Sequence, residues 1–421
     1  MRTPTWIALC LASIFCVLGL QFTGLFQSFL TPVYAQDQGE PFWVFDGHMH
    51  PVWSVYARGG TLGEANSDGR FTLPLAENGG LGAAFVNTAI DEFLEANHLA
   101  VKETLRQFDH FYRELARYPD QIAMATNAEE VRALRRQGKI AAILSIEGAL
   151  ALEGDLGVLR MLHRLGLREM NLVHLLGNNI GDVMHSSENG GMGYGLTEYG
   201  RELVAEMNRL GIVIDLSHTA EQTVMDVMNV STQPVTSTHS AVRALVTSPT
   251  IPNWSDEMIR KLADMNGVIC VPFLPMAVDQ EYQDKFHRGR IRGSALVGLD
   301  PLVYRGEPGT IYDFIRERQS GGDAGRARMS VERRKSMPIL SAAIDHIDYI
   351  ARLVGVDHVA ISTDFGGYPV NLRDIENAAD YQNVAQALLD RDYSREDVAK
   401  IMGENLLRVF DEVVSTATNS R

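Results

Sequence analysis

Residues 208–218 read NRLGIVIDLSH, a stretch in which a helical pattern passes directly into a short β-branched run that stops at a histidine. The helical pattern covers residues 197–210, with Leu203, Met207 and Leu210 on one face and Thr197 at the N-cap position. A helix leading into a buried strand is typical of parallel sheets that are covered by helices. This stretch therefore predicts an α/β fold.

The same alternation of strands and helices recurs along the chain. Helical patterns are predicted at 91–117, 197–210, 219–229 and 337–355, and the first has an apolar stripe formed by Leu94, Val101, Leu105, Phe108, Tyr112 and Leu115. Eight strands are predicted, at residues 42–48, 82–88, 140–146, 170–174, 211–217, 234–238, 267–273 and 358–363. Eight strands with helices between them predict a (β/α)8 TIM barrel.

One long stretch, residues 275–336, lacks this periodicity and reads as an insertion after the seventh strand. From Asp284 to Lys335 it carries 12 basic and 7 acidic residues, in a chain whose net charge is -15. Loops that follow barrel strands face the active site. The insertion is therefore interpreted either as a solvated surface addition or as a lid that contacts the substrate.

The first 35 residues differ from the rest of the chain. Arg2 is the only charged residue before Asp37, residues 6–26 are strongly apolar, and the segment ends in Val33-Tyr34-Ala35. This pattern predicts a secretory signal peptide. The apolar stretch is close to the ~20 residues that span a bilayer, so an N-terminal membrane anchor is the alternative. Residues 36–421 would then form the barrel of a secreted or cell-envelope protein, either periplasmic or membrane-anchored.

Cysteine content and charge exclude several kinds of site. Cys10 and Cys16 lie in the targeting segment, which leaves Cys270 alone in the mature chain. An intramolecular disulfide and a cysteine-rich zinc site are both excluded, so any metal must be held by His, Asp and Glu. The negative net charge argues against binding to nucleic acid or to anionic membrane surfaces.

Ionisable residues gather where the predicted strands end. The set comprises His48 and His50 after the first strand, Glu147 after the third, His174, His218 and His239 after the fourth to sixth, and Asp364 after the eighth. In a barrel these ends converge on one face, where active sites are built. A single histidine is more often a hydrogen-bonded core residue, and His98, His110 and His163, which fall within helical patterns, are interpreted in that way.

The residue types in this set are those of a two-metal site. His48 and His50 are two apart on an extended chain, so both imidazoles point the same way. Imidazole and carboxylate are the ligands that zinc takes when thiolates are missing. We expect His48, His50 and Glu147 at one zinc ion and His218, His239 and Glu147 at a second, with Glu147 bridging the two.

Two metals at such a site favour hydrolysis, because they activate a water and polarise the bond under attack. Asp364 is the candidate that moves the proton of this water, and His174 is the candidate donor to the developing oxyanion.

At these residues the chain closely resembles the membrane dipeptidase (renal dipeptidase) family of zinc metallopeptidases. The resemblance covers about residues 42–411. It implies a barrel with a binuclear zinc site that hydrolyses dipeptides, often with a D-residue on the C-terminal side. It also implies His48, Glu147, His218 and His239 as ligands, His174 as the carbonyl-polarising group and Asp364 as the proton shuttle. The matching segments are residues 46–48, 146–148, 171–174, 195–197, 208–218, 238–240, 355–365 and 403–409.

The sequence departs from the family's pattern at two site positions. His50 stands where the family usually has aspartate, and Thr250 stands where the family has an arginine that clamps the substrate's carboxylate. A hydroxyl is a poor replacement for a bidentate guanidinium, although Arg243 or an arginine of the insertion could take over. The insertion is also longer than expected for the family. The tail 415–421 is polar, so any membrane attachment is expected at the N-terminus.

These departures leave two further readings open beside the dipeptidase. The first is a non-peptidase amidohydrolase on the same barrel, acting on an N-acyl amino acid, a lactone or a cyclic amide. The second is an inactive barrel that serves as an envelope binding protein, which the complete ligand set disfavours. All three readings take a small molecule as partner. A homodimer is compatible with the fold, but no interface signal stands out.

Overall fold

The computed structural model describes residues 39–64, 69–90, 98–174, 178–183, 195–247, 253–286, 335–368 and 370–417. The predicted targeting segment 1–35 and position 250 lie outside these ranges. The unit described below begins at Phe42. No helix within the described ranges is both long enough and apolar enough to cross a membrane.

The described strands form one parallel sheet that closes on itself as a (β/α)8 barrel. The order of the strands is β1-β2-β4-β5-β6-β7-β8-β9, and β3 pairs with the first three residues of β4. Backbone hydrogen bonds from His50 N to Phe365 O (2.7 Å) and from Asp364 N to His48 O (2.8 Å) join the first and last strand ends. The strands are β1 Val44–Met49, β2 Leu81–Ala89, β3 Ile122–Met124, β4 Ile140–Glu147, β5 Glu169–Asn171, β6 Val213–Asp215, β7 Thr236–Ser237, β8 Val268–Pro272 and β9 Val359–Ser362.

Each of the eight predicted strands overlaps one strand of the barrel path, which confirms the predicted fold. The prediction missed β3, which has only three residues and pairs with the first three residues of β4. The predicted strand 170–174 was too long, because β5 ends at Asn171 and His174 lies beyond it.

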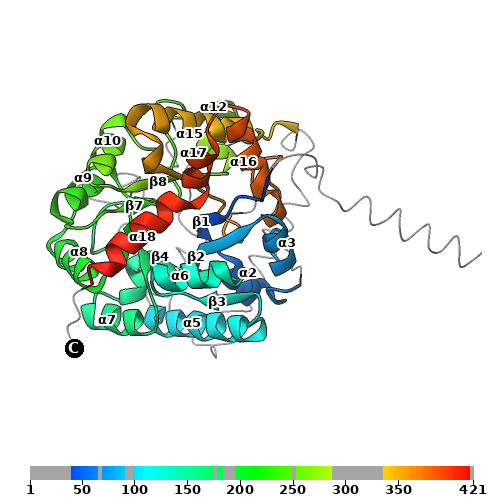
Figure 1. The fold of residues 1–421 in the computed structure, drawn as a ribbon. Helices are drawn as coiled ribbons and strands as arrows, with labels where there is room; N and C mark the ends of the chain where they lie inside the picture. Colours follow the sequence, from blue (N-terminus) through cyan, green and yellow to red (C-terminus); the bar gives the residue numbers. More distant parts are fainter. Residues whose placement is uncertain are drawn as a thin grey trace, which may run out of the picture. The chain divides into compact units, whose positions relative to one another are not determined.

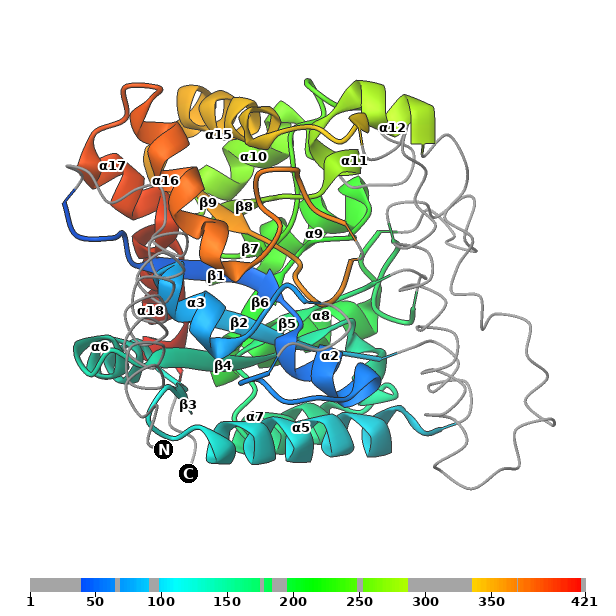
Figure 2. The ribbon, with the colours of Figure 1, turned by 90° about the vertical axis from the view of Figure 1, so that its right-hand side faces the viewer.

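Helices surround the strands on the outside (Figures 1 and 2). Thr197 caps α8 as predicted, since its side chain accepts a hydrogen bond from Gly200 N. The α-helices are α2 Pro51–Arg58, α3 Leu73–Asn78, α5 Ala100–Arg117, α6 Ala128–Arg136, α7 Leu156–Arg164, α8 Glu198–Leu210, α9 Glu221–Val230, α10 Asp256–Asp264, α11 Pro275–Val278, α12 Gln280–Phe286, α15 Leu340–Val354, α16 Tyr381–Leu389, α17 Arg395–Ala399 and α18 Asn405–Ser415. Short 3-10 turns cover η1 Ala149–Leu152, η2 Val356–His358 and η3 Ala378–Asp380, and η4 Lys400–Glu404 is π-helical.

The buried face of α5 differs from the predicted stripe. Leu105 and Tyr112 were expected to be buried, but they are 44% and 38% exposed. The buried face instead carries Glu103, Gln107 and Glu114 among its apolar residues. These polar side chains are tolerated because they find partners, as when Gln107 Nε2 donates to Ala89 O (2.9 Å).

Two smaller predictions also need correction. His98 is not inside a helix: it precedes α5 with a φ of 54°, and its imidazole is exposed, whereas His110 and His163 do lie in α5 and α7. The aperiodic stretch 275–336 begins with two short helices, α11 and α12. Residues 287–334 lie outside the described ranges, so the choice between a surface addition and a lid stays a prediction.

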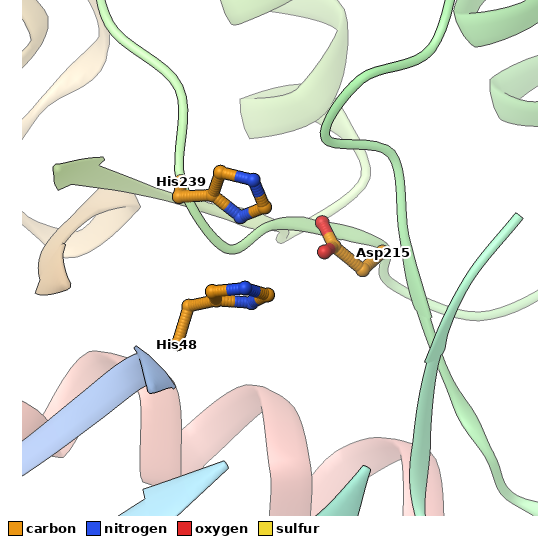
Figure 3. A group of neighbouring side chains, drawn as sticks. All are labelled: His48, Asp215 and His239. Atoms are coloured by element: carbon orange, nitrogen blue, oxygen red, sulfur yellow. The ribbon is translucent and has the colours of Figure 1, made fainter. Parts of the chain in front are cut away.

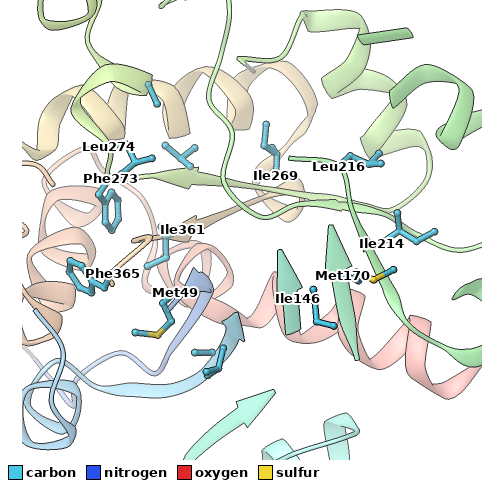
Figure 4. Close-up of a cluster of buried hydrophobic side chains, with 14 of the residues drawn as sticks. Met49, Ile146, Met170, Ile214, Leu216, Ile269, Phe273, Leu274, Ile361 and Phe365 are labelled. Carbon is cyan, nitrogen blue, oxygen red and sulfur yellow. The ribbon is translucent and has the colours of Figure 1, made fainter. Parts of the chain in front are cut away.

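Two apolar layers hold the barrel. The outer layer fills the space between strands and helices, with Met49, Ile146, Ile214 and Ile361 on the outward strand faces (Figure 4). The inner layer includes Phe45, Phe85, Cys270 and, from α18, Phe410. The rings of Phe85 and Phe410 are 6.0 Å apart, and α18 crosses one end of the barrel (Figure 1). This end is therefore plugged, and polar side chains collect at the carboxyl ends of the strands.

Candidate metal centre

All seven predicted site residues lie at the carboxyl end of the barrel. His48 is in β1, His50 follows β1 directly, and Glu147 is the last residue of β4. The other four residues, His174, His218, His239 and Asp364, stand two or three positions after the ends of β5, β6, β7 and β9. The strands position these side chains because parallel strands of a barrel finish at a common face.

Glu147 lies at the middle of the group. Its Oε1 is 3.4 Å from His48 Nε2, 3.3 Å from His218 Nε2, and 3.6 Å from the Nε2 atoms of both His174 and His239. Its Oε2 is 3.4 Å from His50 Nε2. One carboxylate therefore faces five imidazoles, and each presents the same ring nitrogen to it.

Four of the five imidazoles form two pairs through their Nε2 atoms. The Nε2 atoms of His48 and His50 are 3.0 Å apart, and those of His218 and His239 are 2.7 Å apart. Asp364 Oδ1 lies 3.5 Å from His50 Nε2. Since the Nε2 atoms of each predicted ligand pair lie this close together beside Glu147, the donor set fits two metal ions that share Glu147.

The protonation states suit metal ligands. Although burial favours a neutral carboxyl, the imidazoles of His174 and His48 hold the pKa of Glu147 well below its usual value. Burial lowers the pKa of His50 to about 3 and that of His174 to about 4. His48 is the exception: burial lowers its pKa, but Glu147 outweighs burial and raises it to about 9. A metal ion at His48 therefore has to displace a proton.

The pKa of Asp364 is shifted in the opposite direction from that of Glu147. Burial, aided by the charge of Glu147, raises the pKa of Asp364 to about 8. Its backbone has a φ of 55°, and that of His218 is 64°, a region that residues with side chains seldom occupy. Such strain is concentrated at functional sites, where the surrounding structure holds the backbone in place.

Sequence reasoning missed a buried anchor below the imidazoles, formed by Asp215 and Thr238. Asp215 Oδ1 accepts hydrogen bonds from Ser217 N (3.0 Å) and Thr238 N (2.8 Å), and its Oδ2 accepts one from Thr238 Oγ1 (2.5 Å). Figure 3 shows Asp215 beside the rings of His48 and His239. An acid inside the apolar strand segment 211–217 was the signal that could have revealed it.

The Thr238 hydroxyl determines which ring nitrogen carries the hydrogen in His48 and in His239. Its single hydroxyl hydrogen goes to Asp215, so its oxygen can only accept from His48 Nδ1 (3.2 Å) and His239 Nδ1 (3.1 Å). Both imidazoles then carry hydrogen on Nδ1, so Nε2 is the nitrogen of each ring that can bind a metal, in His48 after the loss of its second proton.

A second buried carboxyl, that of Asp46, links the first strand of the barrel to the last. It accepts hydrogen bonds from His48 N (2.9 Å) in β1, from Thr363 Oγ1 (2.6 Å) after β9, and from Tyr381 OH (2.5 Å) at the start of α16. Asp46 therefore fixes the backbone of His48, while the contacts of the imidazole fix its ring.

The Membrane dipeptidase (Peptidase family M19) family model matches residues 35–421. The chain belongs to the membrane dipeptidase family. It is therefore a metal-dependent hydrolase, and a small molecule is its substrate.

Curated relatives agree with the membership. The chain is 29% identical over 360 residues to Dipeptidase tcpJ of Claviceps purpurea, across 84% of this chain and 71% of the relative. It is 28% identical over 358 residues to Dipeptidase aclJ of Aspergillus oryzae, across 83% and 71% of the two chains.

Solved structures have the same fold. The probable dipeptidase PvdM from Pseudomonas aeruginosa matches with a TM-score of 0.68 and 25% identity, over 89% of this chain and 96% of that one. A metallo peptidase from Rhodobacter sphaeroides, solved with a phosphinate mimic of the dipeptide L-Ala-D-Ala, matches with a TM-score of 0.65 and 21% identity, over 89% and 100% of the two chains.

Both departures from the dipeptidase family's pattern bear on this geometry. The larger ring of His50 fits because Gly367 has no side chain: a β-carbon there would lie 2.6 Å from His50 Cδ2 and 2.2 Å from Asp364 Oδ1. Thr250 lies outside the described residues. Arg243, a candidate substitute for the missing arginine, is already engaged, since its Nη1 lies 2.6 Å from Glu221 Oε2 and its Nε donates to Asn253 O.

Proposed function

We propose that this chain is a binuclear zinc metallodipeptidase, which hydrolyses the peptide bond of dipeptides. The observation that carries the proposal is the position of Glu147, whose carboxylate oxygens lie within 3.3–3.6 Å of imidazole nitrogens from both proposed ligand pairs. His48, His50 and Glu147 would hold one zinc ion, and Glu147, His218 and His239 the other. When bound, the two ions supply an activated water at neutral pH and polarise the substrate's carbonyl.

The remaining residues move protons and stabilise charge. Asp364 Oδ1 takes the proton of the attacking water and passes it to the nitrogen of the leaving amine. Burial raises the pKa of Asp364, which favours a carboxyl that can hold the proton until the leaving amine takes it. The imidazole of His174 is 21% exposed, so it can donate an N–H to the carbonyl oxygen as negative charge develops there.

A dipeptide is the substrate favoured by the comparisons, because the curated relatives are named dipeptidases and one solved structure of the fold holds a dipeptide mimic. The engaged state of Arg243 and the threonine at position 250 favour a second candidate. In that case, the same site hydrolyses an N-acyl amino acid, a lactone or a cyclic amide, which need not present a free carboxylate.

The test is a hydrolysis assay with purified, zinc-loaded protein. L,L- and L,D-dipeptides are compared with N-acyl amino acids, and EDTA-treated protein and the Asp364→Asn variant serve as controls. Zinc-dependent release of free amino acids from dipeptides supports the proposal. Turnover of acylated or cyclic substrates alone rejects the dipeptidase and leaves the metal-dependent hydrolase.

We also propose that residues 1–35 direct the chain to the cell envelope or the exterior, as a cleaved signal peptide or as an anchor. The support is the basic start, apolar middle and small-residue end of this segment. Expression in a secreting host followed by N-terminal sequencing tests the proposal. A new N-terminus at Gln36 indicates cleavage, an intact N-terminus in the membrane fraction indicates an anchor, and retention in the cytosol rejects both.

A further inference from the structure

A row of buried polar side chains lies one layer below the metal centre. Asn87, Ser145 and Glu169 occupy facing positions on three neighbouring strands, with Asn87 opposite Ser145 and Ser145 opposite Glu169. All three are fully buried. Ser145 is two residues before Glu147 on β4, so both side chains point into the barrel, one above the other.

The row contains hydrogen-bonding atoms that find no partner in acceptable geometry. Among the described residues these include Asn87 Oδ1, Ser145 Oγ and both carboxyl oxygens of Glu169. Burial, together with the nearby charges of Asp215 and Glu147, raises the pKa of Glu169 well above its usual value. A neutral carboxyl offers one donor and one acceptor to its neighbours.

The hydrogens on the atoms around His48 Nδ1 determine how the Asn87 amide is oriented. Thr238 gives its only hydroxyl hydrogen to Asp215, so His48 Nδ1 must carry the hydrogen of the contact between His48 and Thr238. Asn87 Nδ2 lies 3.0 Å from the same Nδ1, which would place two hydrogen-bearing atoms against each other. A half-turn of the Asn87 amide resolves this conflict, because it brings the oxygen to His48 and the NH2 group to the side of Ser145.

After this half-turn the facing order of the three residues allows a chain of hydrogen bonds once the Ser145 and Glu169 side chains turn toward their neighbours. The Asn87 NH2 group donates toward Ser145 Oγ, and the Ser145 hydroxyl donates toward the carboxyl of Glu169, which is the facing residue on β5. Asn87 Oδ1, unpaired before, then shares the hydrogen of His48 Nδ1 with Thr238 Oγ1. With its hydrogen on Nδ1, His48 keeps its Nε2 lone pair for a metal.

We propose that Asn87, Ser145 and Glu169 form a positioning relay that fixes the tautomer of the metal ligand His48 from the interior of the barrel. Glu169 orients Ser145, Ser145 orients the Asn87 amide, and the amide oxygen holds His48 Nδ1–H. The relay rests on the proposed metal centre and not on the choice of substrate.

The test compares zinc affinity in the full chain, measured by competition with a chromogenic chelator, for the wild type and for two variants at position 169. Glu169→Gln keeps an acceptor and a donor in the same shape and should bind zinc within about threefold of the wild type. Glu169→Leu removes both and should bind zinc about 10–100-fold more weakly, the usual effect of losing a group that orients a ligand.

A purely structural role for Glu169 makes a different prediction. It would lower the melting temperature of the metal-free Glu169→Leu protein and leave the zinc affinity of the folded fraction unchanged. The relay instead predicts that the folded fraction of Glu169→Leu loses zinc affinity, whatever the change in that melting temperature. Should Glu169→Leu not fold, Ser145→Ala, which removes one hydroxyl, should weaken zinc binding in the same direction.

Nitrogen-15 NMR of histidine-labelled, zinc-loaded wild type gives an independent readout. The relay predicts a hydrogen on His48 Nδ1 and metal on Nε2, and a hydrogen on Nε2 would overturn it. Unchanged zinc affinity in folded Glu169→Leu or Ser145→Ala would also overturn it. A wild type that binds no zinc rejects the metal centre itself, whereas inactivity on dipeptides rejects only the dipeptidase.

Discussion

Thr238 donates its hydroxyl hydrogen to Asp215 Oδ2, with 2.5 Å between the two oxygens. This one bond makes the threonine oxygen an acceptor for His48 and His239, which belong to different zinc ions in the proposed ligand assignment. A single buried hydroxyl thereby sets the tautomer of one histidine ligand at each of the two proposed metal positions.

Replacing Thr238 by valine keeps the shape of the side chain and removes the shared acceptor. Zinc affinity should fall about 10–100-fold, because two ligands lose the group that sets their tautomer. Chelator competition measures the effect. Thr236→Val is the matched control, since the Thr236 hydroxyl is equally buried but bonds to Ile214 O. Equal zinc affinities in the two variants would show that Thr238 does not prepare the ligands.

Asp364→Asn should retain its zinc content and lose turnover about 10²–10⁴-fold, the usual contribution of a positioned proton-transfer group. An amide cannot accept the proton of the attacking water, although it has the same shape as the carboxyl. Elemental analysis and kcat on the same preparation separate binding from chemistry. Wild-type kcat in the variant would remove Asp364 from the mechanism.

Gly367→Ala should disturb both His50 and Asp364, because the added methyl would lie 2.6 Å from His50 Cδ2 and 2.2 Å from Asp364 Oδ1. We expect lower zinc content and lower turnover. His50→Asp should restore zinc content when combined with Gly367→Ala, since the smaller carboxylate leaves room for the methyl. If the double variant binds zinc no better than Gly367→Ala alone, the imidazole does not need this space.

The pH dependence of stability should reflect Glu103, whose burial between α5 and α2 raises its pKa from 4.5 to about 7. The unfolded chain ionises at lower pH than the folded chain, so the folded state binds more protons between pH 4.5 and 7. The stabilisation is fully present below pH 4.5 and is lost as the pH rises through about 7. Glu103→Gln should remove this loss, which amounts to about 2–3 kcal/mol.

Urea unfolding at pH 5 and pH 8 measures the effect of Glu103. The wild type should lose more of its free energy of unfolding between these pH values than Glu103→Gln does. Parallel losses in the two proteins would mean that Glu103 ionises normally in the folded state.

Thr250→Arg should lower KM for free dipeptides about tenfold if the substrate's carboxylate lacks a cationic partner, because charge-assisted hydrogen bonds contribute about 1.5–3 kcal/mol. Dipeptide amides, which have no terminal carboxylate, are the matched control and should show no gain. An unchanged KM for free dipeptides would indicate that another cation already binds this group.

The sequence predicted the barrel and the places of the seven candidate residues at its strand ends, because both follow from local patterns. Apolar β-branched runs mark strands, and polar residues at strand ends converge whatever the loop lengths. The face of α5 was predicted wrongly because periodicity places polar residues outside, whereas Glu103, Gln107 and Glu114 are buried with partners. Asp215, Thr238 and Asn87 escaped notice for a similar reason, since their roles depend on side-chain contacts between different strands.

The meeting of β1 and β9 also determines when the site can form during synthesis. His48 stands near the beginning of the barrel and Asp364 near its end, and the backbone bond between them joins residues more than three hundred positions apart. The plugging helix α18 is later still. A ribosome-bound chain that has been made only as far as η2 therefore has every histidine of the site but lacks β9 and α18, which close and plug the barrel. Hydrolytic competence should appear only on release of the finished chain, as a late and all-or-none step of its biogenesis.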